Sequence, residues 1–440
     1  MNFKRVILFS CFCWILSLAF FGKGMHSMAA TATPAQTSSS KATATPAATA
    51  TATPAPSAKP VSGAAVSDFA GAKKAIIAAY KKYESSVDVS AYNLNYETEY
   101  DSLSSMMSEI VNNTPYLFFT GSSYKVSRNT NTNIIVTITL SYADDYKKTD
   151  GSINTKKIKK DKKSIKSEVK SAMTIINKKM GKAEKALALH DYLVEKLAYT
   201  SSKDAYYYKK ETGAFIYNTC NCQGYALAYK ILLNKAGLNS IIVTSDEMDH
   251  EWNKIYIKGK WYNVDVSWDD AIDSISKEDQ YGLVLHDNFL CSDDYFINNG
   301  HSDFEDENYP SDTKYDKKYW KNIKSRMYYV NKTWLYMGVK GICERPKLLK
   351  KKFSVKYNVD GDKFIQYTNN IYFFIYNNSL YQYDYATNVT TPLWKCDDHY
   401  GSDYELVQIK CSGKSLNYKV SNSSSYKSGS LQLTKSGKLA

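Results

Sequence analysis

Apolar residues recur at helical spacing in the first part of the chain and give way to strand-like runs further on. One helix is predicted within the segment FAGAKKAIIAAYKKY, whose apolar residues share a face. A second is expected from Asp101 to about Val111, ending before Pro115. The run NIIVTITLSY is rich in β-branched residues and predicts a strand.

A clearer amphipathic helix is predicted in the segment KAEKALALHDYLVEKLAY. Its apolar stripe consists of Ala183, Leu187, His190, Leu193, Val194 and Leu197. A histidine on such a face is more often a satisfied packing residue than a catalyst. We therefore expect His190 to be structural.

Cys222 stands at the start of another predicted helix, in the segment CQGYALAYKILLNKAGL. One face of this helix carries Tyr225, Tyr229, Leu232, Leu233 and Ala236, and Gly237 fits the position of a C-terminal stop. Unpaired N–H groups at a helix N-terminus stabilise an anion and lower the pKa of a thiol. Cys222 is thus placed to be nucleophilic. The alternative is a buried structural cysteine. If the position at a helix start were the only evidence, this alternative would be favoured.

A β-hairpin is predicted next, with a tight turn at Gly259 between two alternating runs. With a two-residue loop, Ile257 pairs with Lys260, and Trp252 pairs with Asp265.

His250 lies on the same face of this hairpin as Trp252, because side chains alternate along a strand. Asp265 is then its diagonal neighbour on the facing strand, about 7–8 Å away at the backbone, within reach of an imidazole and a carboxylate. Together with Cys222, the hairpin supplies a nucleophile, a base and an orienting carboxylate.

After about Pro310 the pattern becomes repetitive. Two segments that begin at Met327 and Ile371, 44 residues apart, each predict a strand, an Asn-containing turn and a strand. A weaker third copy begins at Leu416. Such a period is typical of propeller repeats, but three copies cannot close a propeller. We expect a small antiparallel β domain or an incomplete remnant.

The N-terminus has the pattern of an exported protein. Residues 1–30 combine a short basic segment, an apolar run and small residues, which predicts a signal peptide or an uncleaved anchor. Residues 31–65 are nearly all Ala, Thr, Pro and Ser and predict a disordered linker. Two folded domains are then expected, at residues 66–310 and 311–440.

The net charge of +13 at pH 7 favours anionic partners. Outside the cell these are cell-wall polymers or lipid headgroups, and we expect no nucleic acid. The densest basic segment is Lys156–Lys170, read as KKIKKDKKSIKSEVK. An ordinary solvated helix face is the simpler interpretation of this segment, and a contact with wall polymers or lipid is the alternative.

Six cysteines remain after the leader: Cys220, Cys222, Cys291, Cys343, Cys396 and Cys411. Their even number allows disulfides in an oxidising compartment, but their spacing does not give a connectivity.

The segments CQGYALAYKILLNKAGL, DHEWNKIYIKGKWYNVDVSWDD and ALHDYLVEKLAY together resemble the transglutaminase-like superfamily. The resemblance implies an α+β, papain-like core, in which a Cys-bearing helix packs on an antiparallel sheet that carries His and Asp. It implies that Cys222 is the nucleophile, His250 the base and Asp265 the orienting acid. It covers about 182–309 well, and the helices before that more loosely. It does not extend to the C-terminal repeats.

The chain departs from the family pattern at three positions. Glu251 replaces the small residue that usually follows the His, and it would raise the pKa of His250 or repel acidic substrates. Ser267 stands where Thr is frequent. Cys220 stands in place of a non-cysteine, as an inert thiol, a partner of Cys291 or a protector of Cys222.

The resemblance also implies an oxyanion hole formed by a backbone N–H of the Cys and an upstream side-chain donor. The candidates for that donor are Tyr206, Tyr207, Tyr208 and Asn218.

Three functions fit these features. The first is a secreted thiol enzyme that acts on amide bonds of proteins or peptides through a thioester, by hydrolysis, deamidation or cross-linking. The second is a non-catalytic, wall-associated binding protein that uses the β repeats and the basic surface. The third, a metal site at Cys220, Cys222 and His250, is disfavoured because Cys-x-Cys lacks the usual zinc spacing. We expect no cofactor, and no acidic calcium loop is evident in the sequence.

Overall fold

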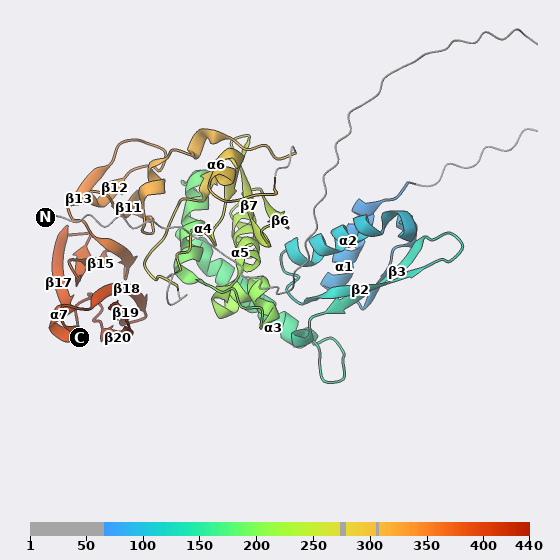
Figure 1. Ribbon diagram of the computed structural model, residues 1–440, viewed down its shortest axis with the longest axis horizontal. Helices are drawn as coiled ribbons and strands as arrows, with labels where there is room; N and C mark the ends of the chain where they lie inside the picture. The colour runs from blue at the N-terminus through green and yellow to red at the C-terminus, as the bar shows by residue number, and fades with distance from the viewer. Residues whose placement is uncertain (1–65, 273–278, 305–307) are drawn as a thin grey trace, which may run out of the picture. The chain divides into compact units, whose positions relative to one another are not determined.

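The computed structural model describes residues 66–272, 279–304 and 308–440 (Figure 1). The predicted leader and linker lie outside these residues. Ala64–Ala440 form one compact unit. Within the described ranges, every helix is too short or too polar to span a lipid bilayer.

The first layer consists of two helices on a small sheet. Helix α1 (Phe69–Lys82) packs against α2 (Tyr96–Asn113). Their sheet has the strand order β1 (Ser86–Asp88), β3 (Ile135–Tyr142) and β2 (Thr120–Arg128). Helix α2 begins five residues before the predicted start, because the Asn95 side chain caps it by accepting from the N–H of Glu97 at 3.0 Å.

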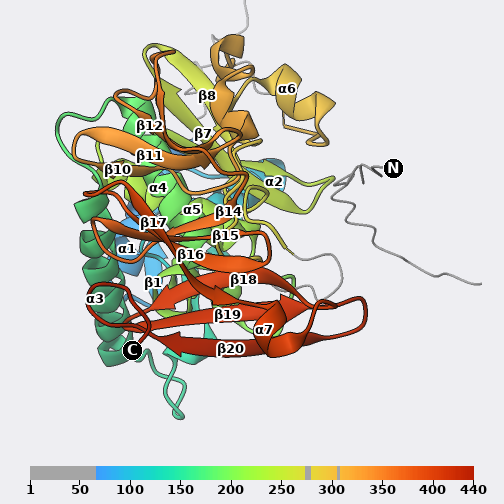
Figure 2. The same cartoon turned by 90° about the vertical axis from the view of Figure 1, so that its left-hand side faces the viewer.

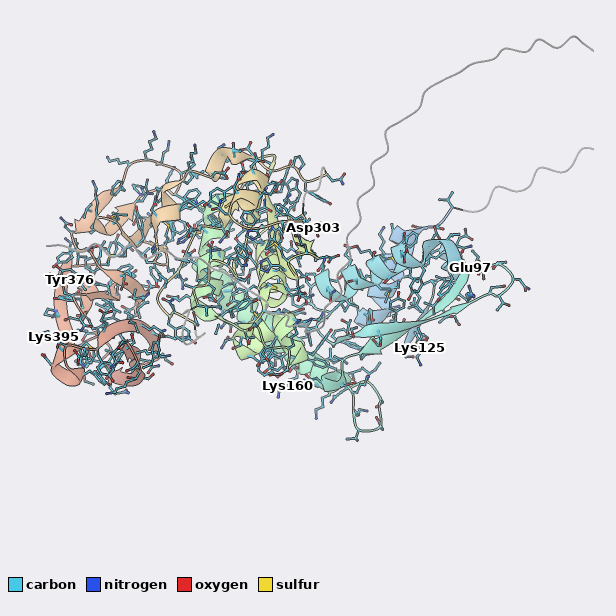
Figure 3. All side chains as sticks on the ribbon, in the orientation of Figure 1. Glu97, Lys125, Lys160, Asp303, Tyr376 and Lys395 are labelled. Carbon is cyan, nitrogen blue, oxygen red and sulfur yellow. The ribbon has the colours of Figure 1, made fainter. Side chains whose placement is uncertain are left out.

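Helix α3 (Thr155–Ala172) carries the lysine-rich segment. Its buried side includes Ile158, Ile165 and Val169. The opposite side forms the lysine face, which we define as the exposed residues Lys156, Lys159, Lys160, Lys163, Lys166 and Lys170. Figure 3 labels Lys160 on this helix.

The central layer places a helix pair beside a four-stranded antiparallel sheet. Helices α4 (Lys182–Lys196) and α5 (Cys222–Lys235) contact each other, and α5 packs against β6 and β7 (Figure 1). The strand order is β6 (Ser240–Ser245), β7 (His250–Ile257), β8 (Lys260–Val264) and β9 (Phe289–Cys291).

The predicted hairpin register is correct, since Ile257 pairs with Lys260 across Gly259, which has a φ of 85°. Helix α5 also begins at the predicted residue. Asn221 caps it by accepting from the N–H of Gly224 at 3.3 Å, and Gly237 follows its end with a φ of 78°.

Three antiparallel sheets make up the C-terminal part (Figure 2). The first holds β10 (Tyr328–Val330), β11 (Thr333–Gly338), β12 (Gly341–Arg345) and β13 (Ser354–Tyr357). The second holds β14 (Asp362–Gln366), β15 (Ile371–Tyr376), β16 (Ser379–Asp384) and β17 (Val389–Lys395). The third holds β18 (Glu405–Ser412), β19 (Ser415–Ser421) and β20 (Tyr426–Gln432).

The repeated sequence segments do not occupy equivalent places in these sheets. The copy at Met327 forms the first and second strands of its sheet, whereas the copy at Ile371 forms the second and third. Consecutive sheets touch through β11 and β14, and through β14 and β18. The largest buried cluster runs from α1 through α4 and α5 to residues such as Trp334, so side chains on both sides of residue 310 share one core.

The remaining elements are short. They include the parallel pair β4 (Ala198–Tyr199) and β5 (Thr219–Cys220), the five-residue helix Gly213–Tyr217, α6 (Asp293–Asn298) and α7 (Asp397–Tyr400).

Candidate active site

The three predicted site residues lie at the ends of three elements. Cys222 is the first residue of α5, His250 is the first residue of β7, and Asp265 follows the last residue of β8. All three are buried. Each backbone position is therefore fixed by regular structure, while its side chain lies at an element end.

His250 connects the other two. Its Nε2 lies 2.6 Å from Oδ2 of Asp265, and its ring interacts with the side chain of Cys222, which helps to raise the pKa of the imidazole. Because a carboxylate only accepts hydrogen bonds, Nε2 carries a proton. The other ring nitrogen, Nδ1, is left for the thiol.

Asp265 is held as an anion from both sides. Its Oδ1 accepts from the N–H of Ser267 at 3.0 Å, from the Ser267 hydroxyl at 2.7 Å and from the N–H of Trp268 at 3.1 Å. Burial works against the charged form, but the charge of His250 and the hydrogen bonds from His250 and His301 outweigh it and hold the pKa of Asp265 well below its usual range. Ser267, which stands where the family often has Thr, thus orients the carboxylate.

His250 is basic as a result. Burial lowers the pKa of this imidazole, but the charge of Asp265 and its hydrogen bond prevail and raise the pKa to about 10. A protonated imidazole beside a sulfur atom favours the nucleophilic thiolate.

A further histidine, His301, joins this site from a loop after α6. Its Nε2 lies 3.0 Å from the same Oδ2 of Asp265 that binds His250. Sequence reasoning missed His301, because it lies 36 residues after Asp265 in a segment without strand periodicity. We call Cys222, His250, Asp265 and His301 the thiol cluster.

Cys220 lies outside the thiol cluster. It is fully buried, and burial followed by the charge of Asp270 raises its pKa well above the ordinary value. It also packs tightly on the helix start: a Cβ placed on Gly224 would lie 2.5 Å from Cβ of Cys220 and 2.8 Å from the carbonyl oxygen of Tyr208.

The six described cysteines are all free thiols, so the considered pair of Cys220 with Cys291 is not formed. Cys291 instead receives a hydrogen bond from Nζ of Lys321 at 2.8 Å. Burial raises its pKa to about 12.

Glu251 lies on the opposite face of β7 from His250, because adjacent strand residues alternate. Burial raises the pKa of its carboxyl to about 7, against the opposing charges of Lys210 and His250. Its Oε2 has no hydrogen-bond partner among the described residues.

The four candidates for the second oxyanion donor make different contacts. The hydroxyl of Tyr206 donates to the carbonyl of Thr120 and is therefore engaged elsewhere. The rings of Tyr207 and Tyr208 pack on each other, with centroids 4.6 Å apart. Asn218 ends the five-residue helix with a φ of 56°. None of these contacts assigns a donor to the site.

A second buried cluster of imidazoles and carboxylates lies beside the first, and we call it the linking cluster. It consists of His190, Asp191, Asp269 and His286. His190 binds Asp191 through Nδ1 at 2.9 Å and Asp269 through Nε2 at 3.0 Å, which confirms that it is a satisfied packing residue. Asp191 also accepts from the N–H of Met327 at 2.8 Å, so the cluster ties α4 to the start of the C-terminal part.

Two groups of described residues bring three metal-ligand atoms within 4.8 Å of one another. They are His250 with Asp265 and His301, and His190 with Asp191 and His286. In both, the nitrogen and oxygen atoms already satisfy each other at hydrogen-bond distances of 2.6–3.1 Å. Neither group contains Cys220 or Cys222, so the described residues do not assemble the cysteine-containing metal site considered from the sequence.

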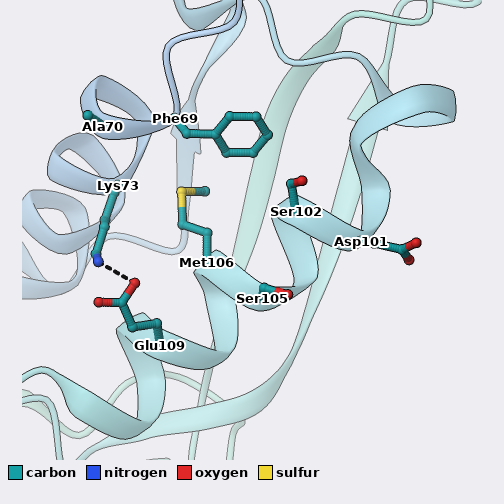
Figure 4. A pocket seen from close by; sticks show the side chains of 8 residues that line it. All are labelled: Phe69, Ala70, Lys73, Asp101, Ser102, Ser105, Met106 and Glu109. Carbon is teal, nitrogen blue, oxygen red and sulfur yellow. Dashed lines mark ion pairs between the residues drawn. The ribbon is translucent and has the colours of Figure 1, made fainter. Parts of the chain in front are cut away.

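Two surface grooves line α2. One, of about 640 Å³, lies between α1 and α2 and is bordered by the ion pair of Lys73 and Glu109 (Figure 4). The other, of about 350 Å³, runs from Ser104 and Asn113 to Thr244 and Glu251.

Residues 169–266 match the profile of the transglutaminase-like superfamily. The chain thus carries a transglutaminase-like domain, and the resemblance drawn from the three sequence segments is confirmed. Human kyphoscoliosis peptidase is 27% identical over 119 residues, which are 24% of this chain and 16% of that protein. The chain therefore spans less than a fifth of that relative's length.

A solved structure described as "Crystal structure of a TGase" is 13% identical, with a TM-score of 0.23, over 40% of this chain and 49% of that chain.

Proposed function

We propose that the protein is a thiol enzyme that acts on amide bonds of proteins or peptides through a thioester, with Cys222 as nucleophile, His250 as base and Asp265 as orienting acid. The observation that carries the proposal is that His250 lies 2.6 Å from Asp265 through Nε2 and that its ring also interacts with the side chain of Cys222. The transglutaminase-like domain supports it, because that family is generally made of cysteine-based enzymes.

In the first half of the reaction, the thiolate of Cys222 bonds to the amide carbonyl carbon, and the π electron pair moves to the oxygen. The carbon–nitrogen bond then breaks, and the Nδ1 proton of His250 passes to the leaving nitrogen. The products are a thioester and a free amine or ammonia.

In the second half, neutral His250 takes a proton from water or from an amine as that molecule attacks the thioester carbon. The thiolate leaves, and the imidazolium is restored. Water gives hydrolysis or deamidation, whereas an amine gives cross-linking. Asp265 keeps the proton of Nε2 in place throughout and stabilises the imidazolium.

Thiol reactivity tests this proposal directly. Iodoacetamide should alkylate Cys222 much faster than Cys220 at neutral pH, and His250→Ala should slow the reaction of Cys222. Mass spectrometry of the digested protein measures both rates. Equal rates at the two cysteines, or no effect of removing the imidazole, would contradict the assignment.

The outcome of the thioester is measured with a peptide library, incubated with and without an added primary amine. A mass increase by water reports hydrolysis, a gain of about one mass unit reports deamidation, and incorporation of the amine reports transfer. A protein without any of these products but with strong wall binding would favour the non-catalytic alternative.

We further propose that the protein is exported and binds anionic cell-wall material through the lysine face. The motivation is the leader pattern together with the six exposed lysines on one side of α3. Changing Lys159, Lys160 and Lys163 to Glu should release the protein from purified walls at low salt, since exposed charges act over about 8–10 Å. Lys125→Glu, at an exposed position on β2, is the matched control (Figure 3). If the variant with three charge reversals were still retained on the walls, the lysine face would be an ordinary solvated surface.

A further inference from the structure

One oxygen of Asp265 serves two imidazoles. Oδ2 lies 2.6 Å from Nε2 of His250 and 3.0 Å from Nε2 of His301. An ionised carboxylate has no proton to give, so each imidazole donates its Nε2–H. The two donors therefore compete for the electron density of the same atom.

The surroundings of His301 fix its charge as well as its tautomer. Its ring lies 4.0 Å from the ring of Phe296 and 4.1 Å from that of Trp268, measured between centroids, and the edge of Trp252 closes a third side at 4.9 Å. Its Nδ1 is buried and has no hydrogen-bond partner among the described residues. A proton on Nδ1 would be a charge in an apolar box, so the neutral imidazole is favoured.

The charged groups around His301 agree with a neutral ring. Burial lowers its pKa, and the opposing effects of Asp265 and Asp269 do not restore it, while the charge of His250 lowers it further. Glu247 accepts from the hydroxyl of Ser302 at 3.1 Å but is exposed to solvent. Asp303 is at the exposed end of the same turn, where water screens its charge.

We propose that His301 is a positioning residue of the thiol cluster: as a neutral donor to Oδ2 of Asp265, it limits how strongly this carboxylate stabilises the imidazolium form of His250. The inference rests on the proposed function, in which the His250 imidazolium must give its Nδ1 proton to the leaving nitrogen. A general acid works best with a pKa near the operating pH, and a full, unshared ion pair with Asp265 would hold the proton too tightly.

The contacts of the other carboxylate oxygen make this role separable from simple anchoring. Oδ1 is held by Ser267 and by the N–H of Trp268, so Asp265 keeps its orientation when His301 is changed. Loss of the His301 donor should then strengthen the pair of His250 with Asp265 instead of breaking it.

The test is an NMR titration of the imidazoles in the full chain, with the His250 signals assigned from a His250→Gln variant. His301→Phe keeps a ring in the aromatic box but removes the donor. It should raise the pKa of His250 by roughly one to two units, the size of one charge-assisted hydrogen bond. His301→Gln, whose amide nitrogen reaches the same place as Nε2, should return the pKa to the wild-type value.

An unchanged or lowered pKa of His250 in His301→Phe would overturn the proposal and leave His301 a packing residue. A second measurement needs no substitution: the ¹⁵N shifts of wild-type His301 at neutral pH should show a protonated Nε2 and a bare Nδ1. The opposite tautomer, or an imidazolium, would also overturn it. Because neither measurement needs turnover, an inactive protein would refute the proposed function without deciding the role of His301.

Discussion

The thiol cluster and the linking cluster both bury imidazoles beside carboxylates, but they do so in different ways. They are close neighbours, since the N–H of Asp269 in one donates to the carbonyl of Asp265 in the other at 3.3 Å. Both hold two histidines at hydrogen-bond distance from aspartate. Of the two, only the thiol cluster includes a cysteine side chain that interacts with a histidine ring.

The difference lies in what the second ring nitrogen does. In His190 both nitrogens bind carboxylates, and in His286 the second nitrogen, Nδ1, binds the carbonyl of Ile323 at 2.9 Å. In His250 one nitrogen is left for a thiol. A pair of His and Asp therefore does not mark a catalyst, because the linking cluster has such pairs at the same distances and uses them to join α4 to later segments.

The largest effect that separates the clusters should come from the sulfur atom. Cys222→Ala removes the nucleophile, so amide turnover should fall by on the order of 10³-fold or more. Its thermal unfolding should change little. Cys220→Ala, made at the buried thiol outside the thiol cluster, is the control and should keep turnover. A Cys222→Ala protein that still turns over would place the chemistry elsewhere.

Asp265→Asn should cost about 10²–10⁴-fold in turnover, because the imidazole loses its tautomer and its counter-charge. The alkylation rate of Cys222 at neutral pH should fall along with turnover. Turnover within tenfold of wild type would mean that the carboxylate only supports the fold.

Asp191→Asn carries the same chemical change into the linking cluster and should act on stability. The buried imidazole of His286 loses its anionic partner and that of His190 keeps only Asp269, so we expect the free energy of unfolding to fall by roughly 3–5 kcal/mol. Turnover per folded molecule should be retained. Urea unfolding, followed by an active-site titration with iodoacetamide, measures both quantities. If the variant stayed stable but lost turnover, the linking cluster would also serve catalysis, and the proposed difference between the clusters would be wrong.

Asp270 and Asp279 form a buried acidic pair without an imidazole, and the smallest expected effect concerns this pair. Burial raises the pKa of Asp279 from 3.8 to about 7, although the charges of Lys410, Lys363 and Lys419 and a hydrogen bond with Asp270 lower it. The folded state holds a proton there that the unfolded chain releases. Stability from this group is thus present below about pH 4 and is lost as the pH rises towards 7.

Asp279→Asn should reduce this decline, leaving the part that comes from Asp270, whose pKa burial also raises, and should stabilise the protein by roughly 1–3 kcal/mol at pH 8 relative to wild type. Melting curves at pH 4.5 and pH 8 give the two slopes. Parallel slopes for the two proteins would show that Asp279 is not the titrating group.

Local features of the sequence predicted most of what positions the thiol cluster. Gly259 fixed the hairpin register, and the register alone brought His250 to Asp265. The helix start at Cys222 followed from a periodic apolar face. These features depend on neighbours within a few residues, for which backbone geometry is decisive.

The parts that could not be predicted depend on contacts between distant segments. His301 reaches Asp265 from an irregular loop, and Asp191 meets Met327 across 136 residues. No periodicity encodes such contacts. The C-terminal repeats were detected by their shared pattern of strand, turn and strand. Any two adjacent strands of a meander show the same pattern. The copies at Met327 and Ile371 could therefore not be assigned to particular strands.

The close fit of Gly224 against Cys220 bears on how this sequence can diverge. The two positions are not independent, because any side chain at 224 would occupy the space of the Cys220 side chain and of the Tyr208 carbonyl. Drift at 220 is accordingly limited to residues no larger than cysteine, such as Ala or Ser, for as long as the helix start keeps its place. Size therefore limits position 220 independently of any chemical role of its sulfur.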